Sequence, residues 1–274
     1  MPTTYAHFRL GESVAEALPA SIRETVCNHK ELFQIGVHGP DIFFYHNPLL
    51  KNNIVCLGQR MHHETGASFF IPAASVIHKN AEKEAHKAYL YGFLCHFAMD
   101  VTCHGYIAEQ IEKTGISHFE IEAEYDRELL ERDGYEAVSK CLTGHLKPTY
   151  KNAAVISDFW SEVNPKQVAQ TIKRQIFFLN LLRAPSRIKR NILLALMKLS
   201  GQYDTLHGLI INYRENAACR ETTAWLMEHY DKAVQLAVDL ITEYENYLQT
   251  GGKLSETFFY DFESEKHTQK KQKI

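Results

Sequence analysis

The stretch NAEKEAHKAYLYGFLCHFAMDVTCHGYIAEQIE, residues 80–112, carries the clearest helical periodicity in the chain. Its apolar side chains recur at intervals of three and four residues, and Asn80 is a suitable N-cap for a helix that starts there. Within this stretch, His96, Asp100 and His104 follow one another at intervals of four. Because each residue turns a helix by about 100°, the three side chains fall within roughly 80° of one face. The stretch therefore predicts one long helix with three possible metal ligands on the same face.

A second histidine–carboxylate pair, His118 and Glu122, repeats the four-residue spacing on the helix expected after Ser117. Imidazole nitrogens and carboxylate oxygens are the ligands that zinc accepts where thiolates are not used, and one carboxylate can bridge two ions. A single pair of this kind arises often by chance, whereas the whole series is much more specific. The alternative is a set of histidines satisfied by hydrogen bonds in a polar core. The uneven distribution of histidine, with eleven of 15 in the first 118 residues, favours a functional role.

The rest of the chain also has the pattern of helices. Residues 11–35 predict two short helices interrupted at Pro19, and residues 222–249 predict a long helix that stops before two glycines. The alternation and tight turns of β-hairpins are nearly absent. Since no repeat or linker divides the chain, we expect an all-α fold: a single-domain multi-helix bundle over residues 1–262 and a disordered, lysine-rich tail over residues 263–274.

The composition is typical of a globular protein and gives no sign of a disulfide-rich or membrane-spanning one. A hydrophobic fraction of 45% in 274 residues allows a sizeable core, and a net charge of −3 gives no overall attraction to nucleic acid or anionic lipid. The six cysteines lack the paired spacing of thiolate zinc sites and disulfide frameworks. No signal peptide opens the sequence and no run of 18 apolar residues occurs. We therefore expect a cytoplasmic chain, or one that has already been processed, without a transmembrane segment.

Five short motifs make the chain similar to a known family: AHFRLGE at residues 6–12, GPDIFFYH at 39–46, RMHHE at 60–64, CHFAMDVTCHGY at 95–106 and HFEIE at 118–122. With these motifs the chain resembles the zinc-dependent phospholipase C family, whose helical fold is shared with nucleases that prefer single strands. The resemblance covers roughly the first 125 residues, and the second half matches only as further helix.

The resemblance implies a zinc cluster. One zinc would be held by His96, Asp100, Asp41 and His62, and a second by His104, His118 and Glu122. Asp100 would also bridge to a third zinc through His7. In the secreted phospholipases an N-terminal amino group completes that third site, whereas this chain starts with Met1 and Pro2, so two or three ions are expected. His63 directly follows His62, and we favour His62 as the ligand.

Zinc ions held in this way activate water against a phosphodiester, which is the reaction that we expect. Asp41 is the candidate catalytic residue for orienting or deprotonating that water, with Glu120 as a weaker alternative. The aromatic run Phe43, Phe44 and Tyr45 forms either a substrate-binding wall or part of the core. Ile42 directly follows Asp41, where choline-selective members of the family carry an aromatic residue, so choline specificity is not expected. The alternatives are a nuclease or phosphatase with the same cluster, and a zinc-binding protein without activity.

One stretch, residues 166–198, is both basic and amphipathic. No acidic residue occurs between Glu162 and Asp204, while lysines and arginines alternate with large apolar residues. Such a stretch can rest on an anionic phospholipid membrane surface or, less favoured here, contact nucleic-acid phosphates. The alternative is a pair of core helices that turn a basic face to solvent.

Overall fold

A computed structural model describes residues 4–48, 50 and 52–266, and every regular element in these ranges is a helix. The prediction of an all-α fold is confirmed. The hydrophobic core draws on residues from Tyr5 to Phe262. No helix within the described ranges is long and apolar enough to span a membrane.

The α-helices of the first half are α1 (Thr4–Ala17), α2 (Ala20–Asn28), α3 (Lys30–Gly36), α4 (Asn53–His62), α5 (Gly66–Lys79), α6 (Lys83–Thr114) and α7 (His118–Arg132). Those of the second half are α8 (Tyr150–Ser157), α9 (Pro165–Leu182), α10 (Arg187–Leu199), α11 (Tyr203–Leu206) and α12 (Arg220–Thr250). Four 3₁₀-helices join them: η1 (Gly39–Tyr45), η2 (His207–Leu209), η3 (Ala217–Cys219) and η4 (Glu256–Phe259).

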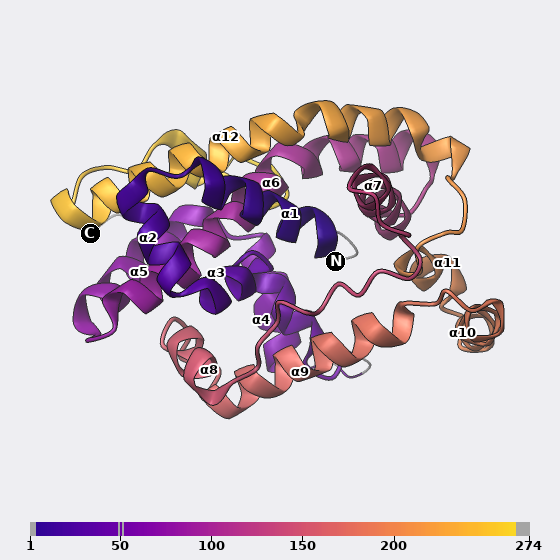
Figure 1. Cartoon of the computed structure of the whole chain (residues 1–274), viewed down its shortest axis with the longest axis horizontal. Helices are drawn as coiled ribbons and strands as arrows, with labels where there is room; N and C mark the ends of the chain where they lie inside the picture. Colours follow the sequence, from indigo (N-terminus) through magenta and orange to yellow (C-terminus); the bar gives the residue numbers. More distant parts are fainter. Residues whose placement is uncertain (1–3, 49, 51, 267–274) are drawn as a thin grey trace.

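Helix α6 is the central helix of the fold, and α12 packs along it (Figure 1). On another side α3 packs directly onto α6, because Gly92 leaves room for the neighbouring backbone. A Cβ atom on Gly92 would lie 2.1 Å from the carbonyl oxygen of Phe33, well inside van der Waals contact. This close approach fixes where the chain leaves α3, and η1 follows within three residues.

The element boundaries differ from the sequence expectation in two places. Residues 11–35 lie in three helices rather than two, because a break at His29 separates α2 from α3. The long helix starts at Lys83 rather than at Asn80, because Asn80 is instead the C-cap of α5, where its backbone N–H donates to two carbonyls of that helix.

The last described residues return to the end of α4 and the middle of α6. The backbone N–H of Phe262 donates to the carbonyl of His62 (3.1 Å), and the Ser264 hydroxyl lies within hydrogen-bond distance of the carbonyls of Asp100 and Val101. An isolated β-bridge joins Tyr260 to Lys266. The expected disordered tail from residue 263 is therefore wrong for residues 263–266, since these backbone contacts order them, and residues 267–274 lie outside the described ranges.

Candidate metal centre

Five helices bring the eight predicted ligands together in three groups. Within each group the possible ligand atoms lie within 4.8 Å of one another. The groups are His7, His96 and Asp100; Asp41, His62 and His96; and His104, His118 and Glu122. His96 belongs to two groups, so the first two share a side chain.

Asp100 lies between the groups, near the middle of α6. One carboxylate oxygen, Oδ2, lies 3.0 Å from Nε2 of His96. The other oxygen, Oδ1, lies 3.5 Å from Nε2 of His7 and 3.6 Å from Nε2 of His104. Its two oxygens thus face histidines of different groups, which is the arrangement that a bridging carboxylate requires.

The turn between α3 and η1 positions Asp41. Gly39 has φ +48°, and a Cβ atom there would lie 2.3 Å from the ring of His96, so only glycine allows the turn to pack on that ring. Two residues later, Oδ1 of Asp41 lies 3.1 Å from Nε2 of His62. Nδ1 of His62 lies 2.8 Å from the carbonyl oxygen of Gly58, which requires an N–H at Nδ1 and leaves the lone pair on Nε2. His63 is exposed and belongs to none of the three groups.

His104 and α7 form the third group. Oε1 of Glu122 lies 3.1 Å from Nε2 of His118 and 3.7 Å from Nε2 of His104. Nδ1 of His104 donates to the carbonyl oxygen of Phe262 (2.8 Å), so the C-terminal segment orients this imidazole. Nothing in the sequence indicated that contact, because the two residues are far apart in the chain.

The place of His7 depends on a contact between α1 and α7. Asp126, buried in α7, accepts hydrogen bonds from the backbone N–H groups of Tyr5 (3.0 Å) and Ala6 (2.8 Å). These are unpaired donors of the first turn of α1, which a carboxylate satisfies well. Asp126 is therefore a positioning residue for His7, and the sequence analysis did not identify it.

The cluster has the properties of a metal site rather than of a hydrogen-bonded core. Among the described residues, both ring nitrogens of His96, Nδ1 of His7 and Oδ2 of Asp100 are buried without a hydrogen bond of acceptable geometry. His96 and Asp100 do come within 3.0 Å of each other, but their orientation does not satisfy a hydrogen bond. Several buried polar atoms in this state are costly unless a ligand pairs with them. Nitrogen and oxygen donors in this number fit zinc.

The charges of the cluster shift the pKa values of its members in opposite directions. Burial would raise the pKa of Asp100, but the neighbouring His104, His96 and His7 hold it below its usual range. Burial lowers the pKa of His7 to about 3, and His96 adds to this effect. Burial would also lower the pKa of His104, but Asp100 and Glu122 raise it to about 10. The metal-free site therefore favours ionised carboxylates around a protonated His104.

Zinc binding at pH 7 is expected to release about one proton from His104, since zinc takes the neutral imidazole. The folded metal-free chain keeps this proton up to a pKa of about 10, whereas an unfolded histidine loses it near 6.5. Protonated His104 therefore stabilises the folded metal-free chain below about pH 6.5, and this stabilisation is lost toward about pH 10, while zinc affinity rises over the same pH range.

Titration calorimetry in buffers of different ionisation enthalpy measures the proton that His104 releases. His104→Gln should reduce the buffer dependence, although the pKa of His62 is also raised beside Asp41. A wild type without any buffer dependence would contradict the prediction.

A cavity of about 530 Å³ opens onto the cluster. Seven of the eight predicted ligands line it, and His96 lies beneath them, fully buried. The wall also includes residues that the sequence analysis did not identify, of which Gln59, Phe119 and Glu263 are the clearest. Phe119 stands within the HFEIE motif, where its neighbours gave some signal. Glu263 gave none, because only the return of the C-terminal segment brings it to the cavity.

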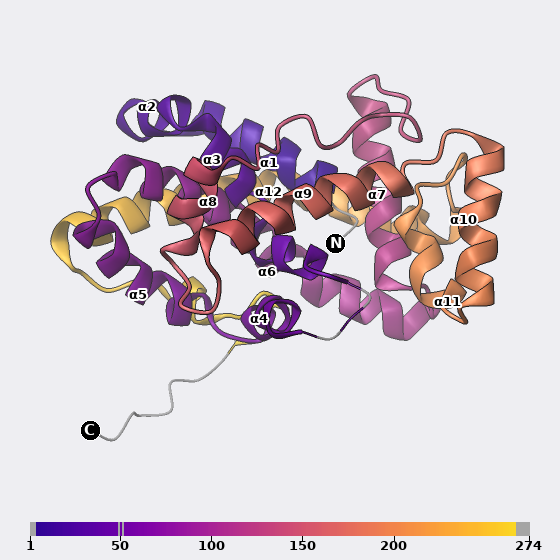
Figure 2. The ribbon, with the colours of Figure 1, turned by 90° about the horizontal axis from the view of Figure 1, so that it is seen from below.

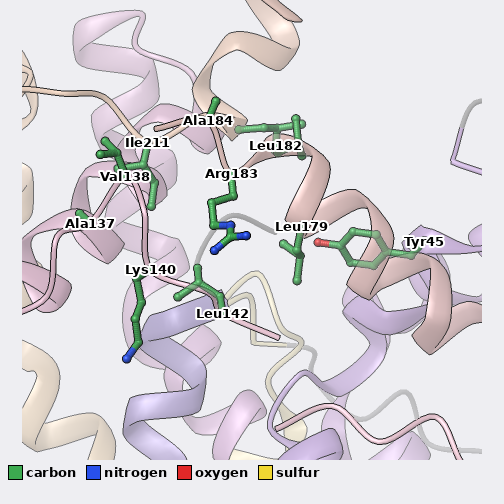
Figure 3. A pocket seen from close by; sticks show the side chains of 11 residues that line it. Tyr45, Ala137, Val138, Lys140, Leu142, Leu179, Leu182, Arg183, Ala184 and Ile211 are labelled. Atoms are coloured by element: carbon green, nitrogen blue, oxygen red, sulfur yellow. The ribbon is translucent and has the colours of Figure 1, made fainter. Parts of the chain in front are cut away.

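The aromatic run in η1 divides between the cavity and the core. Phe44 lines the cavity and contacts the ring of His62. Phe43 has no exposed surface and packs on Trp160, which is the core alternative. Tyr45 is also buried and lines a separate small pocket, with its hydroxyl turned toward Leu179 (Figure 3). In a 3₁₀-helix successive side chains diverge by about 120°, because one turn takes three residues.

Glu120, the weaker candidate for a catalytic base, lies outside the cavity wall. Its Oε2 is 3.3 Å from Nε2 of His207, and its Oε1 accepts a hydrogen bond from the side-chain amide of Asn216 (2.7 Å). These contacts fix η2 against α7, so Glu120 has a structural role in this geometry.

Comparison with known protein families gave a match over more than half of the chain. A family model described as zinc dependent phospholipase C matches residues 6–176, more than half of the chain, and all eight predicted ligands lie within the matched residues. No curated protein and no solved structure matches the chain.

Proposed function

The chain belongs to the zinc-dependent phospholipase C family, and we propose that it is a phosphodiesterase that hydrolyses a phospholipid or a related phosphodiester at this cluster. The observation that carries the proposal is the position of Asp100, whose two oxygens face different histidine groups at the base of an open cavity. A structural zinc site is closed by its protein ligands, whereas this cluster adjoins a space that a substrate can enter.

The residues of the cluster would hold two or three zinc ions in the groups described above. When bound, zinc supplies a lowered pKa for the attacking water and positive charge that stabilises the transition state. The charge of the cavity supports this requirement. Asp41, Asp100, Glu122 and Glu263 all line it, and a phosphodiester anion would be repelled by these carboxylates unless cations balanced them.

Asp41 is the residue that we propose as the proton acceptor. Its side chain is 13% exposed at the cavity wall, and His62 holds one of its oxygens. A carboxylate fixed in this way can orient the attacking water and take up its proton. The hydrogen bond of His62 to Gly58 keeps that histidine, and through it Asp41, in place.

The cavity wall suggests how a substrate is bound. Phe44 and Phe119 offer aromatic surfaces on two sides, while Gln59 and the exposed His63 supply polar groups. A cavity of this size accommodates a drug-sized molecule or a phospholipid headgroup with part of its glycerol. The wall therefore fits an amphipathic phosphodiester.

The test compares substrate classes on the zinc-loaded full chain. We expect hydrolysis of bis-p-nitrophenyl phosphate and of a short-chain phospholipid, lost on chelation and restored by zinc. Activity confined to p-nitrophenyl phosphate would indicate a monoester phosphatase. Activity on single-stranded DNA alone, falling steeply as salt rises, would indicate a nuclease. Tight zinc retention without turnover of any of these would overturn the proposal.

A further inference from the structure

Helix α10 exposes a row of large aliphatic side chains. The exposed fractions are 75% for Ile188, 56% for Ile192, 57% for Leu196 and 85% for Leu199. At about 100° per residue, the four side chains lie within roughly 80° of one helix face. We call this row the α10 ridge.

The ridge is not the face by which α10 packs on the protein. The opposite face carries Met197 and Leu193, which form a small apolar cluster with Ile210 and with residues of α11. The α10–α11 pair thus has its own packing, separate from the main core. The alternative of a core helix with a solvated basic face does not account for this exposed aliphatic row on α10.

Apart from the ridge, the charged side chains of α10 are all positive. By the same helical geometry, Lys189 adjoins one edge of the ridge, whereas Lys198 and Arg187 lie about 80° and 100° beyond the other edge. In the described part of the chain none of the three makes an ion pair, and no acidic residue occurs between Glu162 and Asp204. Lys189 donates to the carbonyls of Asn180 and Arg183, so even its partners are uncharged.

An apolar row on a helix whose charges are all positive fits one kind of surface better than others. A second copy of the chain would bring two cationic helices together, which is unfavourable. A bilayer with anionic lipids offers acyl chains to the row and phosphates to the positive charges, as for helices that lie in the membrane interface. The 13 residues of α10 are too few to cross a bilayer. We propose that α10 docks the protein on an anionic phospholipid surface by inserting the α10 ridge.

The α10–α11 end of the molecule packs on α7 through η2. Helices α10 and α11 form one end of the molecule, and α5 lies at the other end (Figures 1 and 2). Directly after α11, η2 packs on the start of α7, where a Cβ atom on Gly208 would lie 2.6 Å from the backbone nitrogen of Glu120. Glu120 stands between the predicted ligands His118 and Glu122. The α10–α11 end thus packs on the helix that carries two predicted ligands, and docking itself does not rest on the proposed function.

The test is co-sedimentation of the full chain with vesicles. One set holds equimolar phosphatidylcholine and phosphatidylglycerol, and the other holds phosphatidylcholine alone. We expect the wild type to bind the anionic vesicles, and the double variant Ile192→Ser with Leu196→Ser to bind them at least about tenfold more weakly. The matched control is Ile71→Ser, an isoleucine that is 44% exposed on α5 at the opposite end, and it should bind like the wild type.

A second variant separates charge from insertion. Arg187→Gln with Lys198→Gln should weaken binding to the anionic vesicles and reduce its dependence on salt. Circular dichroism melts verify that each variant is folded, and hydrolysis of bis-p-nitrophenyl phosphate on the same samples reports on the cavity separately. Equal sedimentation of the wild type and the ridge variant would overturn the proposal. So would a wild-type dimer, seen by light scattering, that the ridge variant loses while vesicle binding stays unchanged.

Discussion

Asp100→Asn is expected to release zinc from more than one group. It should also lower the rate of phosphodiester hydrolysis by more than about a hundredfold, because loss of a residue that only supports a metal ligand already lowers activity by up to that factor. The reason is that Asp100 faces His96 through one oxygen and both His7 and His104 through the other. Asparagine keeps the volume of the side chain but replaces one carboxylate oxygen by an amide nitrogen, which cannot bind a metal ion. Metal content by mass spectrometry and hydrolysis of bis-p-nitrophenyl phosphate on the same samples measure both effects.

Asp158→Asn is the matched control for this variant. Asp158 also pairs with a buried histidine, since its Oδ2 lies 3.0 Å from Nε2 of His86, but neither residue belongs to a metal group. The control should keep the wild-type zinc content and activity. A chain that binds stoichiometric zinc equally well with and without Asp100 would show that the histidine groups do not act as one cluster.

Asp41→Asn is expected to lower kcat by about 10²–10⁴-fold, the range for removing a general base, while much of the zinc stays bound. The amide keeps one oxygen beside His62 but cannot accept a proton. Zinc at the group of His104, His118 and Glu122 should be unaffected, because Asp41 is not a member of it. Single-turnover rates, KM and metal content of the variant separate these effects.

His63→Gln provides the comparison for Asp41→Asn. His63 lines the same cavity but is exposed and outside the three groups, so its loss should affect KM more than kcat. If zinc and activity fall in parallel in Asp41→Asn, then Asp41 is a ligand only and another group accepts the proton.

Sequence spacing alone could indicate only those ligands that lie close to one another on the same helix. His96, Asp100 and His104 share a helix, as do His118 and Glu122, and the helical repeat converts a spacing of four into a common face. Asp41, His62 and His7 stand in other helices and lack such a spacing. They entered only through the resemblance of their motifs to the family, and the structure then brought them to the same cluster.

The cavity wall was predicted less well than the ligands. The aromatic run Phe43 to Tyr45 was considered as a unit, but the 3₁₀ conformation of η1 sends its side chains in different directions, and only Phe44 reaches the cavity. Glu263 was assigned to a disordered tail because its neighbours are polar. Hydrogen bonds from a segment more than 150 residues away in sequence order it instead.

The sequence by itself determined the helical class, the family and the face of α6 that carries the ligands, because these depend on repeats of three to four residues and on short motifs. Only the tertiary structure decided that Gly39 packs on His96 with Asp41 beside His62, that the carbonyl of Phe262 orients His104, and that the α10 ridge faces solvent. Each of these depends on contacts between segments far apart in the chain. Local periodicity cannot predict such contacts, since an apolar helical face has the same sequence pattern whether protein, lipid or water covers it.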